Sequence, residues 1–358
     1  MSVTIKDVAK AAGVSVASVS RALNGHDNVT RDTCERIMQA AQQLHYMPNG
    51  AARSLITRRT QTIGALLPDL HGAFFSELIR GIDRAARARG LHLLVSSSHD
   101  NADEAAATLR AMRGRVDGLL VMSPHASPGF LSDNLPPELP TVLMSTGGDD
   151  DHHARLTVDN HGGAWAMTRH LIDGGYQRIA FVCGPEHNID AAERLRGYRD
   201  AMGKLADAPG CCVLSGDFSE QAGYDAGHQL LGMDPRPQAV FAANDMMALG
   251  VLAACNEAGM SVPEDMALAG FDDIPMARYM TPSLSTVRIH IADFGERALA
   301  RLVETIDQAD DKPTTEEVIP TELVVRTSCG VPANNVLPLD AGAAHAAADH
   351  AFEDRGQP

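Results

Sequence analysis

The 358-residue sequence predicts a small all-helical head, followed by an α/β body made of two doubly wound parallel-sheet lobes. Two patterns predict this fold. In the first 46 residues, apolar side chains recur at helical spacing and glycines interrupt them, which indicates three short helices. From Thr62 onward, apolar strands alternate with amphipathic helices, as in a parallel sheet covered by helices on both faces.

The head is expected to form a helix-turn-helix unit supported by a third helix. Thr4 and Asp7 have the spacing of a capping box, and Gly13 ends the first helix. Ser15 and Thr30 are expected to cap the second and third helices. Two short helices joined by a tight glycine turn are typical of a helix-turn-helix. The predicted inward residues of the second and third helices are Val19, Ala22, Leu23, Cys34, Ile37, Met38, Ala41 and Leu44.

The body is expected to contain two α/β units in series. The first begins with the strand "TIGALLPDL", and the alternation restarts after "TVDN" with a helix over 163–173. Ligands bind such folds at the carboxyl ends of the strands, so a cleft between the lobes is predicted. The expected divisions are a head (1–46), a hinge segment (47–60), a first lobe (61–160 plus about 289–317), a second lobe (161–288 plus about 318–330) and a flexible tail (331–358).

Charge is distributed unevenly along the chain. Residues 1–62 hold eight Lys/Arg and four Asp/Glu, a net of +4, which leaves −20 for the remainder of a chain whose formal net charge is −16. A basic head on an acidic body is expected when only the head meets nucleic-acid phosphates.

Several classes of protein are not expected. No apolar run reaches the roughly 18 residues of a membrane helix, and no signal peptide is visible, so a cytoplasmic location is predicted. The six cysteines have neither CxxC nor zinc spacing, which favours free thiols and no metal. No GxGxxG follows a strand, no HExxH or phosphate loop occurs, and "GVSVA" misses the G-x-S-x-G elbow, so no enzyme and no cofactor are predicted.

Four stretches carry a family resemblance: "TIKDVAKAAGVSVASVSRALNG", "YMPNGAARSL", "ANDMMALG" and "GFDD". They resemble the lactose-repressor/galactose-repressor (LacI/GalR) family of bacterial transcriptional regulators, from about Thr4 to Ser328. The resemblance implies a hinge helix after the head and a periplasmic-binding-protein-like body. It also implies a homodimer that binds a pseudo-palindromic operator, represses carbohydrate-utilisation genes and responds to a small sugar-like effector in the cleft.

The second helix of the head is expected to read the major groove of DNA. Short side chains at its start, Val16 and Ala17, would let it enter the groove, where Ser20 and Arg21 could bond to base edges or phosphate. The resemblance places specificity on Val16, Ala17 and Arg21. The alternative is that Val16 and Ala17 pack inside the head. Four residues at helix starts are expected to meet phosphates: Thr4, Ser15, Asn28 and Thr30.

The segment "NGAARSLIT" holds an apolar Leu55 among arginines. The resemblance implies that this hinge becomes a helix in the minor groove, with Ala52, Arg53 and Leu55 at the DNA and Leu55 wedged between base pairs. The alternative is that the leucine attaches the linker to the body.

The predicted effector site combines a guanidinium, an amide and a carboxylate, which suit the paired hydroxyls of a sugar. The resemblance places these groups on Arg194, Asn244 and Asp272. Strand-end residues of the first lobe such as Ser145 are neutral where some relatives carry Asn or Asp, so that lobe is expected to make fewer charged contacts. Rings that could stack on a sugar are Phe74, Phe75 and Phe218, with core packing as the alternative for one of the first two.

The mechanism that the resemblance implies is a two-state switch in which ligand closes the cleft and changes the hinge segments of the dimer. Two other readings stay open: a purine or nucleoside effector in the same fold, and a cytoplasmic sugar-binding protein without a DNA role. The identity of the effector, the sign of the response and the choice between dimer and tetramer are not predicted.

Overall fold

The computed structural model describes residues 3–23, 28–46, 59–99, 101–125, 128–147, 152–204, 212–307 and 316–331. The chain divides into two compact units, Met1–Thr60 and Gln61–Pro358. The predicted hinge contacts Ala52, Arg53 and Leu55 lie outside the described residues, as do residues 332–358 of the expected tail.

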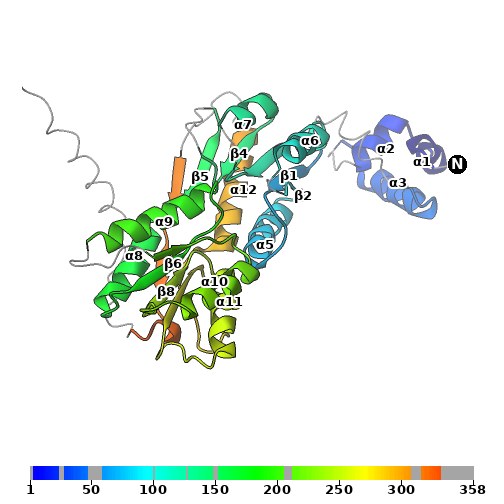
Figure 1. Cartoon of the computed structure of the whole chain (residues 1–358). Helices are drawn as coiled ribbons and strands as arrows, with labels where there is room; N and C mark the ends of the chain where they lie inside the picture. The colour runs from blue at the N-terminus through cyan, green and yellow to red at the C-terminus, as the bar shows by residue number, and fades with distance from the viewer. Residues whose placement is uncertain are drawn as a thin grey trace, which may run out of the picture. The chain divides into compact units, whose positions relative to one another are not determined.

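The head unit contains helices α1 (Ile5–Ala12), α2 (Val16–Leu23) and α3 (Arg31–Gln43) (Figure 1). The backbone nitrogen of Thr4 donates to Asp7 Oδ2 (2.9 Å) at the start of α1, and Gly13 ends that helix with a φ of 65°. Ser18 N donates to Ser15 Oγ (3.1 Å), so Ser15 caps α2. Val8, Val19 and Ile37 are fully buried between the three helices, which confirms the predicted helical head.

One expectation for α3 was wrong, and one was confirmed in part. Met38 is 54% exposed, because the inward face is set by its neighbours Ile37 and Ala41, and the next residue along a helix points about 100° away. Thr30 is the N-cap residue of α3, as expected, but its side chain donates to Thr33 Oγ1 (2.9 Å) and makes no capping bond to the backbone.

The first lobe of the body is built on a six-stranded sheet in the order β11-β5-β4-β3-β1-β2, and every pairing in it is parallel. Helix α12 packs on α5, and this close approach requires Gly81, since a Cβ there would lie 2.0 Å from the Ala292 oxygen. The elements of the first lobe are β1 (Thr62–Leu67), α5 (Ala73–Ala88), β2 (His92–Ser97), α6 (Ala102–Met112), β3 (Gly118–Met122), α7 (Pro128–Asn134), β4 (Thr141–Met144), β5 (Ala154–Val158), α12 (Ile291–Asp307) and β11 (Glu316–Ile319).

The second lobe repeats the arrangement with the order β12-β10-β9-β8-β6-β7, in which only β12 runs antiparallel to its neighbour β10. Its elements are α8 (Asn160–Asp173), β6 (Ile179–Val182), α9 (Ile189–Met202), β7 (Cys212–Leu214), α10 (Glu220–Leu231), β8 (Ala239–Ala242), α11 (Asp245–Glu257), β9 (Ala267–Asp272), β10 (Ser285–Arg288), β12 (Glu322–Val324) and the 3-10 turn Thr327–Cys329.

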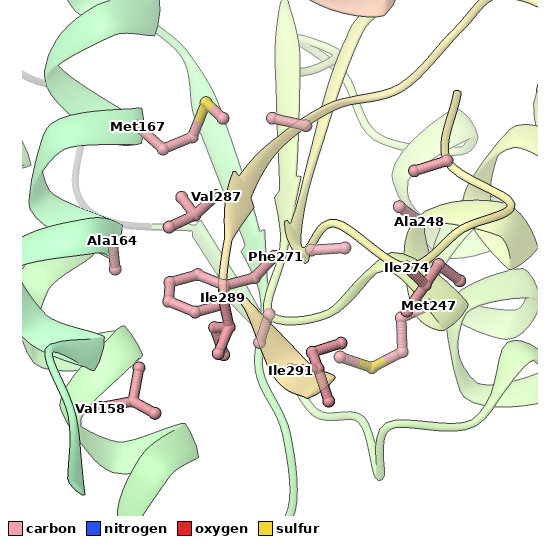
Figure 2. Packing of buried hydrophobic residues seen from close by; sticks show 14 of the residues in the cluster. Val158, Ala164, Met167, Met247, Ala248, Phe271, Ile274, Val287, Ile289 and Ile291 are labelled. Carbon is pink, nitrogen blue, oxygen red and sulfur yellow. The ribbon is translucent and has the colours of Figure 1, made fainter. Parts of the chain in front are cut away.

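Apolar layers cover both faces of this second sheet. Figure 2 shows Phe271 of β9 pointing towards Ala164 of α8, with Val287 of β10 alongside. Met247 and Ile274 lie on the other side of the strand (Figure 2). Phe271, near the carboxyl end of β9, and Ile274, just after it, therefore face different helical layers (Figure 2).

The chain passes between the lobes after β5, after β10 and after β11. Figure 1 shows α12 among the elements of the first lobe, although it follows the second lobe in sequence. The end of the first sheet lies close to the expected boundary at about residue 317. Strand β11 pairs with β5 through Ile319, whose buried side chain lies beside Val158, so the first sheet extends to Ile319.

Candidate functional site

Arg194 of α9 is the centre of a buried polar network at the carboxyl ends of the second sheet. Its Nε donates to Asn160 Oδ1 (2.8 Å) and its Nη1 donates to the Ala243 carbonyl oxygen (2.6 Å). Nη1 also lies 3.1 Å from Asp272 Oδ1. The guanidinium carbon sits 3.8 Å from the centre of the Phe271 ring, a cation–π contact. With only 5% of its surface exposed, Arg194 is held in a single position.

Asn160 extends this network to a second carboxylate that was not predicted. Its Nδ2 donates to Asp190 Oδ1 (2.8 Å), so the amide bridges Asp190 and Arg194. Burial raises the pKa of the Asp190 carboxyl, and Arg194, Ser145 and Asn160 oppose that rise. Asp190 stands four residues before Arg194 on one helix, and this spacing could have revealed the pair in the sequence. Asn160 carried no comparable signal.

Asp272 ends strand β9 in an unusual backbone conformation. Its φ is 107°, and that of Asp273 is 54°, both in the region that favours glycine. Asp272 is 4% exposed, and its Oδ1 has no aligned hydrogen bond despite the short distance to Arg194. Burial raises the pKa of this carboxyl to about 6, and the Arg194 charge works in the opposite direction. The structure thus brings two of the predicted effector residues, Arg194 and Asp272, into contact.

Asn244 and Phe218 lie beside this pair. Asn244 caps α11, since its Oδ1 accepts from Met247 N (2.9 Å), and its Nδ2 donates to the Phe218 carbonyl oxygen (3.0 Å). Phe218 has a φ of 73° and its ring centre lies 5.7 Å from the Arg194 guanidinium. The Asn244 amide therefore already has protein partners on both atoms, and its contact with an effector stays a prediction.

The first lobe contributes neutral groups. Phe74 and Phe75 begin α5, and their rings meet edge to face at 5.4 Å while both side chains pack against the main core. Core packing therefore remains an alternative for them. Ser145 follows β4 with a φ of 46° and is 1% exposed; its hydroxyl lowers the pKa of Asp190 but makes no aligned hydrogen bond. The lobes also meet where Ile189 N donates to the Pro124 carbonyl oxygen (3.3 Å).

A cavity of about 220 Å³ opens next to the network, between α5 of the first lobe and the segment after β9. None of the six predicted effector residues lines it. Its charged lining is balanced, since Arg80 pairs with Glu77, and Asp273 accepts from Arg288 Nε (2.7 Å). The cavity is lined by Glu77, Arg80, Asp273, Pro275, Arg278 and residues 288–293.

The predicted DNA-reading face of the head is accessible. Val16 is 41% exposed, and Ala17 and Arg21 are exposed as well, while Ser20 is half-buried. Val19 of the same helix points into the core. This removes the alternative that Val16 and Ala17 pack inside the head, and their base contacts stay predictions. The four predicted phosphate contacts are all exposed: Thr4, Ser15, Asn28 and Thr30.

Neither the single tryptophan of the chain nor the thiol of Cys212 takes part in the polar contacts around Arg194. The Trp165 ring lies 5.3 Å from Lys204 Nζ. Cys212 is a free thiol whose pKa is raised by burial, and its neighbour Cys211 lies outside the described residues. Within the described ranges, no group of three His, Cys, Asp or Glu side chains could hold a metal ion, and no helix is long and apolar enough to cross a membrane.

Two family descriptions match the chain. Residues 4–49 match "Bacterial regulatory proteins, lacI family", and residues 168–329 match "Periplasmic binding protein-like domain". The HTH-type transcriptional repressor PurR of Escherichia coli O1:K1 / APEC is 35% identical over 329 residues, which cover 91% of this chain and 96% of PurR.

Solved structures share the fold of most of the chain. A lac repressor dimer bound to operator and the anti-inducer ONPF is similar with a TM-score of 0.83 and 25% identity, covering 92% of this chain and 99% of that one. A complex of the regulator CelR with cellobiose has a TM-score of 0.66 and 31% identity, over 91% and 99%. A ribose-bound regulator from Enterococcus faecium has a TM-score of 0.67 and 28% identity, over 75% and 98%.

Proposed function

The chain belongs to the LacI family of DNA-binding transcriptional repressors, which are not enzymes, and on that premise we propose that it represses carbohydrate-utilisation genes. It would bind a pseudo-palindromic operator as a homodimer in the cytoplasm. A small sugar or sugar derivative in the cleft between the lobes would control that binding.

The observation that carries the sugar proposal is the Arg194–Asp272 pair. A guanidinium offers donors and a carboxylate offers acceptors, so the pair matches two neighbouring hydroxyl groups of a polyol. Asn160 accepts a hydrogen bond from Arg194 and donates one to Asp190, which fixes the position of the arginine. Two of the similar structures, of CelR and of the E. faecium regulator, contain cellobiose and ribose.

A purine or nucleoside is the second candidate effector. It is favoured by the aromatic rings near Arg194, because Phe218 and Phe271 both lie within cation–π distance of the guanidinium. A flat heterocycle needs such rings for stacking and amide or carboxylate groups for its edges.

The DNA proposal is supported by the head. The exposed residues Val16, Ala17 and Arg21 lie on one accessible side of α2, and residues 1–62 carry a net charge of +4 in a chain whose net charge is −16. The dimer proposal is supported by exposed apolar residues of the body: Leu94 on the edge strand β2, and Met276 and Tyr279 after β9, the last with 75% of its surface exposed. The operator-bound lac repressor is itself a dimer.

The proposed switch is a change in how the lobes meet. To alter operator occupancy usefully, the effector must favour one state by roughly 3 to 5 kcal/mol. The contacts Ile189–Pro124 and Asp190–Ser145 join the lobes next to Arg194, so a ligand there would strengthen or replace them.

The test is a mobility-shift titration on the upstream region of the gene, with and without a panel of monosaccharides, disaccharides, purines and nucleosides. Arg21→Ala should weaken binding to the specific site by about 10- to 100-fold, the value of one bidentate base contact. Leu55→Ala should also weaken it, because the proposed wedge would be lost.

Arg36→Ala is the matched control, since it removes the same charge from an exposed head position without a predicted base contact. It should weaken binding to all sequences alike. Absence of any sequence-preferring shift would refute the regulator proposal, and a response to a nucleobase instead of a sugar would select the second candidate.

A further inference from the structure

Asp245 is a buried carboxylate behind the Arg194 network that the proposed function does not use. It is fully buried as the first residue of α11. Its Oδ2 accepts from Ile274 N (2.9 Å), and its Oδ1 accepts from Thr286 Oγ1 (2.6 Å). One side chain thus connects the helix, the turn after β9 and the middle of β10.

The turn that Asp245 holds is strained. Asp272 and Asp273 both have positive φ, and each such non-glycine residue costs on the order of 1 kcal/mol or more unless its surroundings enforce it. The enforcing contacts come from Asp245: directly through Ile274 N, and through Thr286 Oγ1, which lies 3.4 Å from Asp273 N. Strand β9 also passes close to the Asp245 carboxylate at Gly270, where an added Cβ would lie 2.2 Å from Asp245 Oδ1.

The carboxylates of Asp272 and Asp273, which are adjacent in this turn, contact different arginines. Asp272 meets Arg194 in the candidate effector site. Asp273 accepts from Arg288 Nε (2.7 Å) and Arg326 Nη2 (2.6 Å). Arg288 is the last residue of β10, directly before the chain crosses to α12 of the first lobe. The turn therefore joins the effector site to a segment between the lobes.

We propose that Asp245 is a positioning residue for the effector response. By holding the turn of Asp272 and Asp273 in its left-handed form, it aims Asp272 at the effector and keeps Asp273 on the arginine that precedes the crossover. A ligand contact at Asp272 then moves a turn whose other end is bonded to that crossover. The ligand half of this inference rests on the proposed function, whereas the connection between turn and crossover does not.

The first experiment uses no ligand. Amide hydrogen exchange of the full chain is followed for the turn (270–276) and for the crossover (286–292). Asp245→Asn, Asp245→Ala and Thr286→Val should each speed exchange about tenfold or more in both segments, because a lost buried hydrogen bond is worth roughly that factor. Thr286→Val preserves the side-chain shape and serves if Asp245→Ala does not fold.

Ser328→Ala is the matched control. The buried Ser328 hydroxyl also bridges β9 and β10, since it donates to the Leu268 oxygen (2.6 Å) and accepts from Ser285 N (2.8 Å), but at the opposite ends of those strands. Ser328→Ala should lower the free energy of unfolding without speeding amide hydrogen exchange at the turn or at the crossover. Faster exchange at the turn alone, or equal effects of Ser328→Ala, would overturn the proposal.

The second experiment adds cellobiose or ribose to operator mobility shifts. Thr286→Val should keep the operator affinity of the ligand-free protein within about threefold, because α2 and the head are untouched, and should reduce the sugar-induced change by about tenfold. An unchanged sugar response in Thr286→Val would overturn the proposed role. If wild type responds to neither sugar, the proposed effector class fails, while the exchange experiment still decides the connection between turn and crossover.

Discussion

The two lobes of the body share one strand order but carry different side chains at the carboxyl ends of their strands. In the second lobe, Asp272 ends β9, and short polar contacts join it to Arg194 of α9 and, through Asn160 at the start of α8, to Asp190. In the first lobe the corresponding ends hold the phenylalanine pair that starts α5, and Ser145. One fold is thus used for a charged site and for a neutral one.

This difference indicates that the two lobes contribute differently to ligand recognition. Burying a charge is costly unless it is paired, so the paired groups of the second lobe must be assembled before a ligand arrives. A neutral partner surface can approach and withdraw at little electrostatic cost. We therefore expect the second lobe to supply most of the binding free energy and the first lobe to supply the movement.

The largest expected effect comes from Arg194→Ala. It would leave the buried Asp272 and the half-buried Asp190 without their cation, which costs about 3 to 5 kcal/mol of stability, and effector binding should be lost. Urea unfolding measures the first effect and titration calorimetry with the responsive sugar measures the second.

The first lobe offers a matched arginine. Arg155 of β5 donates from Nη2 to the Thr146 oxygen (3.2 Å) and lies 3.6 Å from Glu316 Oε1, with 15% of its side chain exposed. Arg155→Ala should cost about 1 to 2 kcal/mol of stability, since one hydrogen bond and one partly exposed ion pair are lost, and effector affinity should change little. Equal losses of affinity in the two variants would contradict the proposed division between lobes.

Asp272→Asn should separate binding from stability. The folded-state pKa of Asp272, about 6, lies above its ordinary value of 3.8, so the folded protein binds this proton more tightly than the unfolded chain does. Ionisation of Asp272 therefore costs stability as the pH rises from about 4 through 6, by at most about 3 kcal/mol for a shift of this size. The asparagine variant avoids that cost, so it should become the more stable protein above pH 6 while losing its sugar response.

Urea unfolding of both proteins at pH 5.0, 6.0 and 7.5 gives the measurement. The stability difference in favour of Asp272→Asn should grow over this range and level off above pH 6. A difference that shrinks with rising pH would mean that the ionised carboxylate stabilises the fold, and Arg194 would then outweigh burial at this position.

The fold of both lobes could be predicted from the sequence, but only part of the candidate site could. Periodicity predicted the helical head and both lobes, and the family resemblance predicted that Arg194 and Asp272 share a cleft. Met38 was assigned wrongly because one residue of error rotates a helical side chain by about 100°. Asn160 and the contacts of Asp245 could not be found, since the partners of both residues lie far away in sequence, and a left-handed backbone at Asp272 has no signal when the residue is not glycine.

The smallest expected effect, Ser145→Ala, tests the comparison from the first lobe. Ser145 Oγ is buried without an aligned hydrogen bond, so removing it should change stability by less than about 1 kcal/mol and affinity by less than about fivefold. The variant should also raise the pKa of Asp190, because the Ser145 hydroxyl lowers that pKa in the wild type. As the pH falls, Asp190 of the variant should then take up its proton, and sugar binding should weaken, at a slightly higher pH than in the wild type. Calorimetric titrations between pH 5 and 7.5 measure both effects. A loss as large as that of Arg194→Ala would mean that the closed cleft depends on this hydroxyl as much as on the guanidinium, and recognition would then belong equally to both lobes.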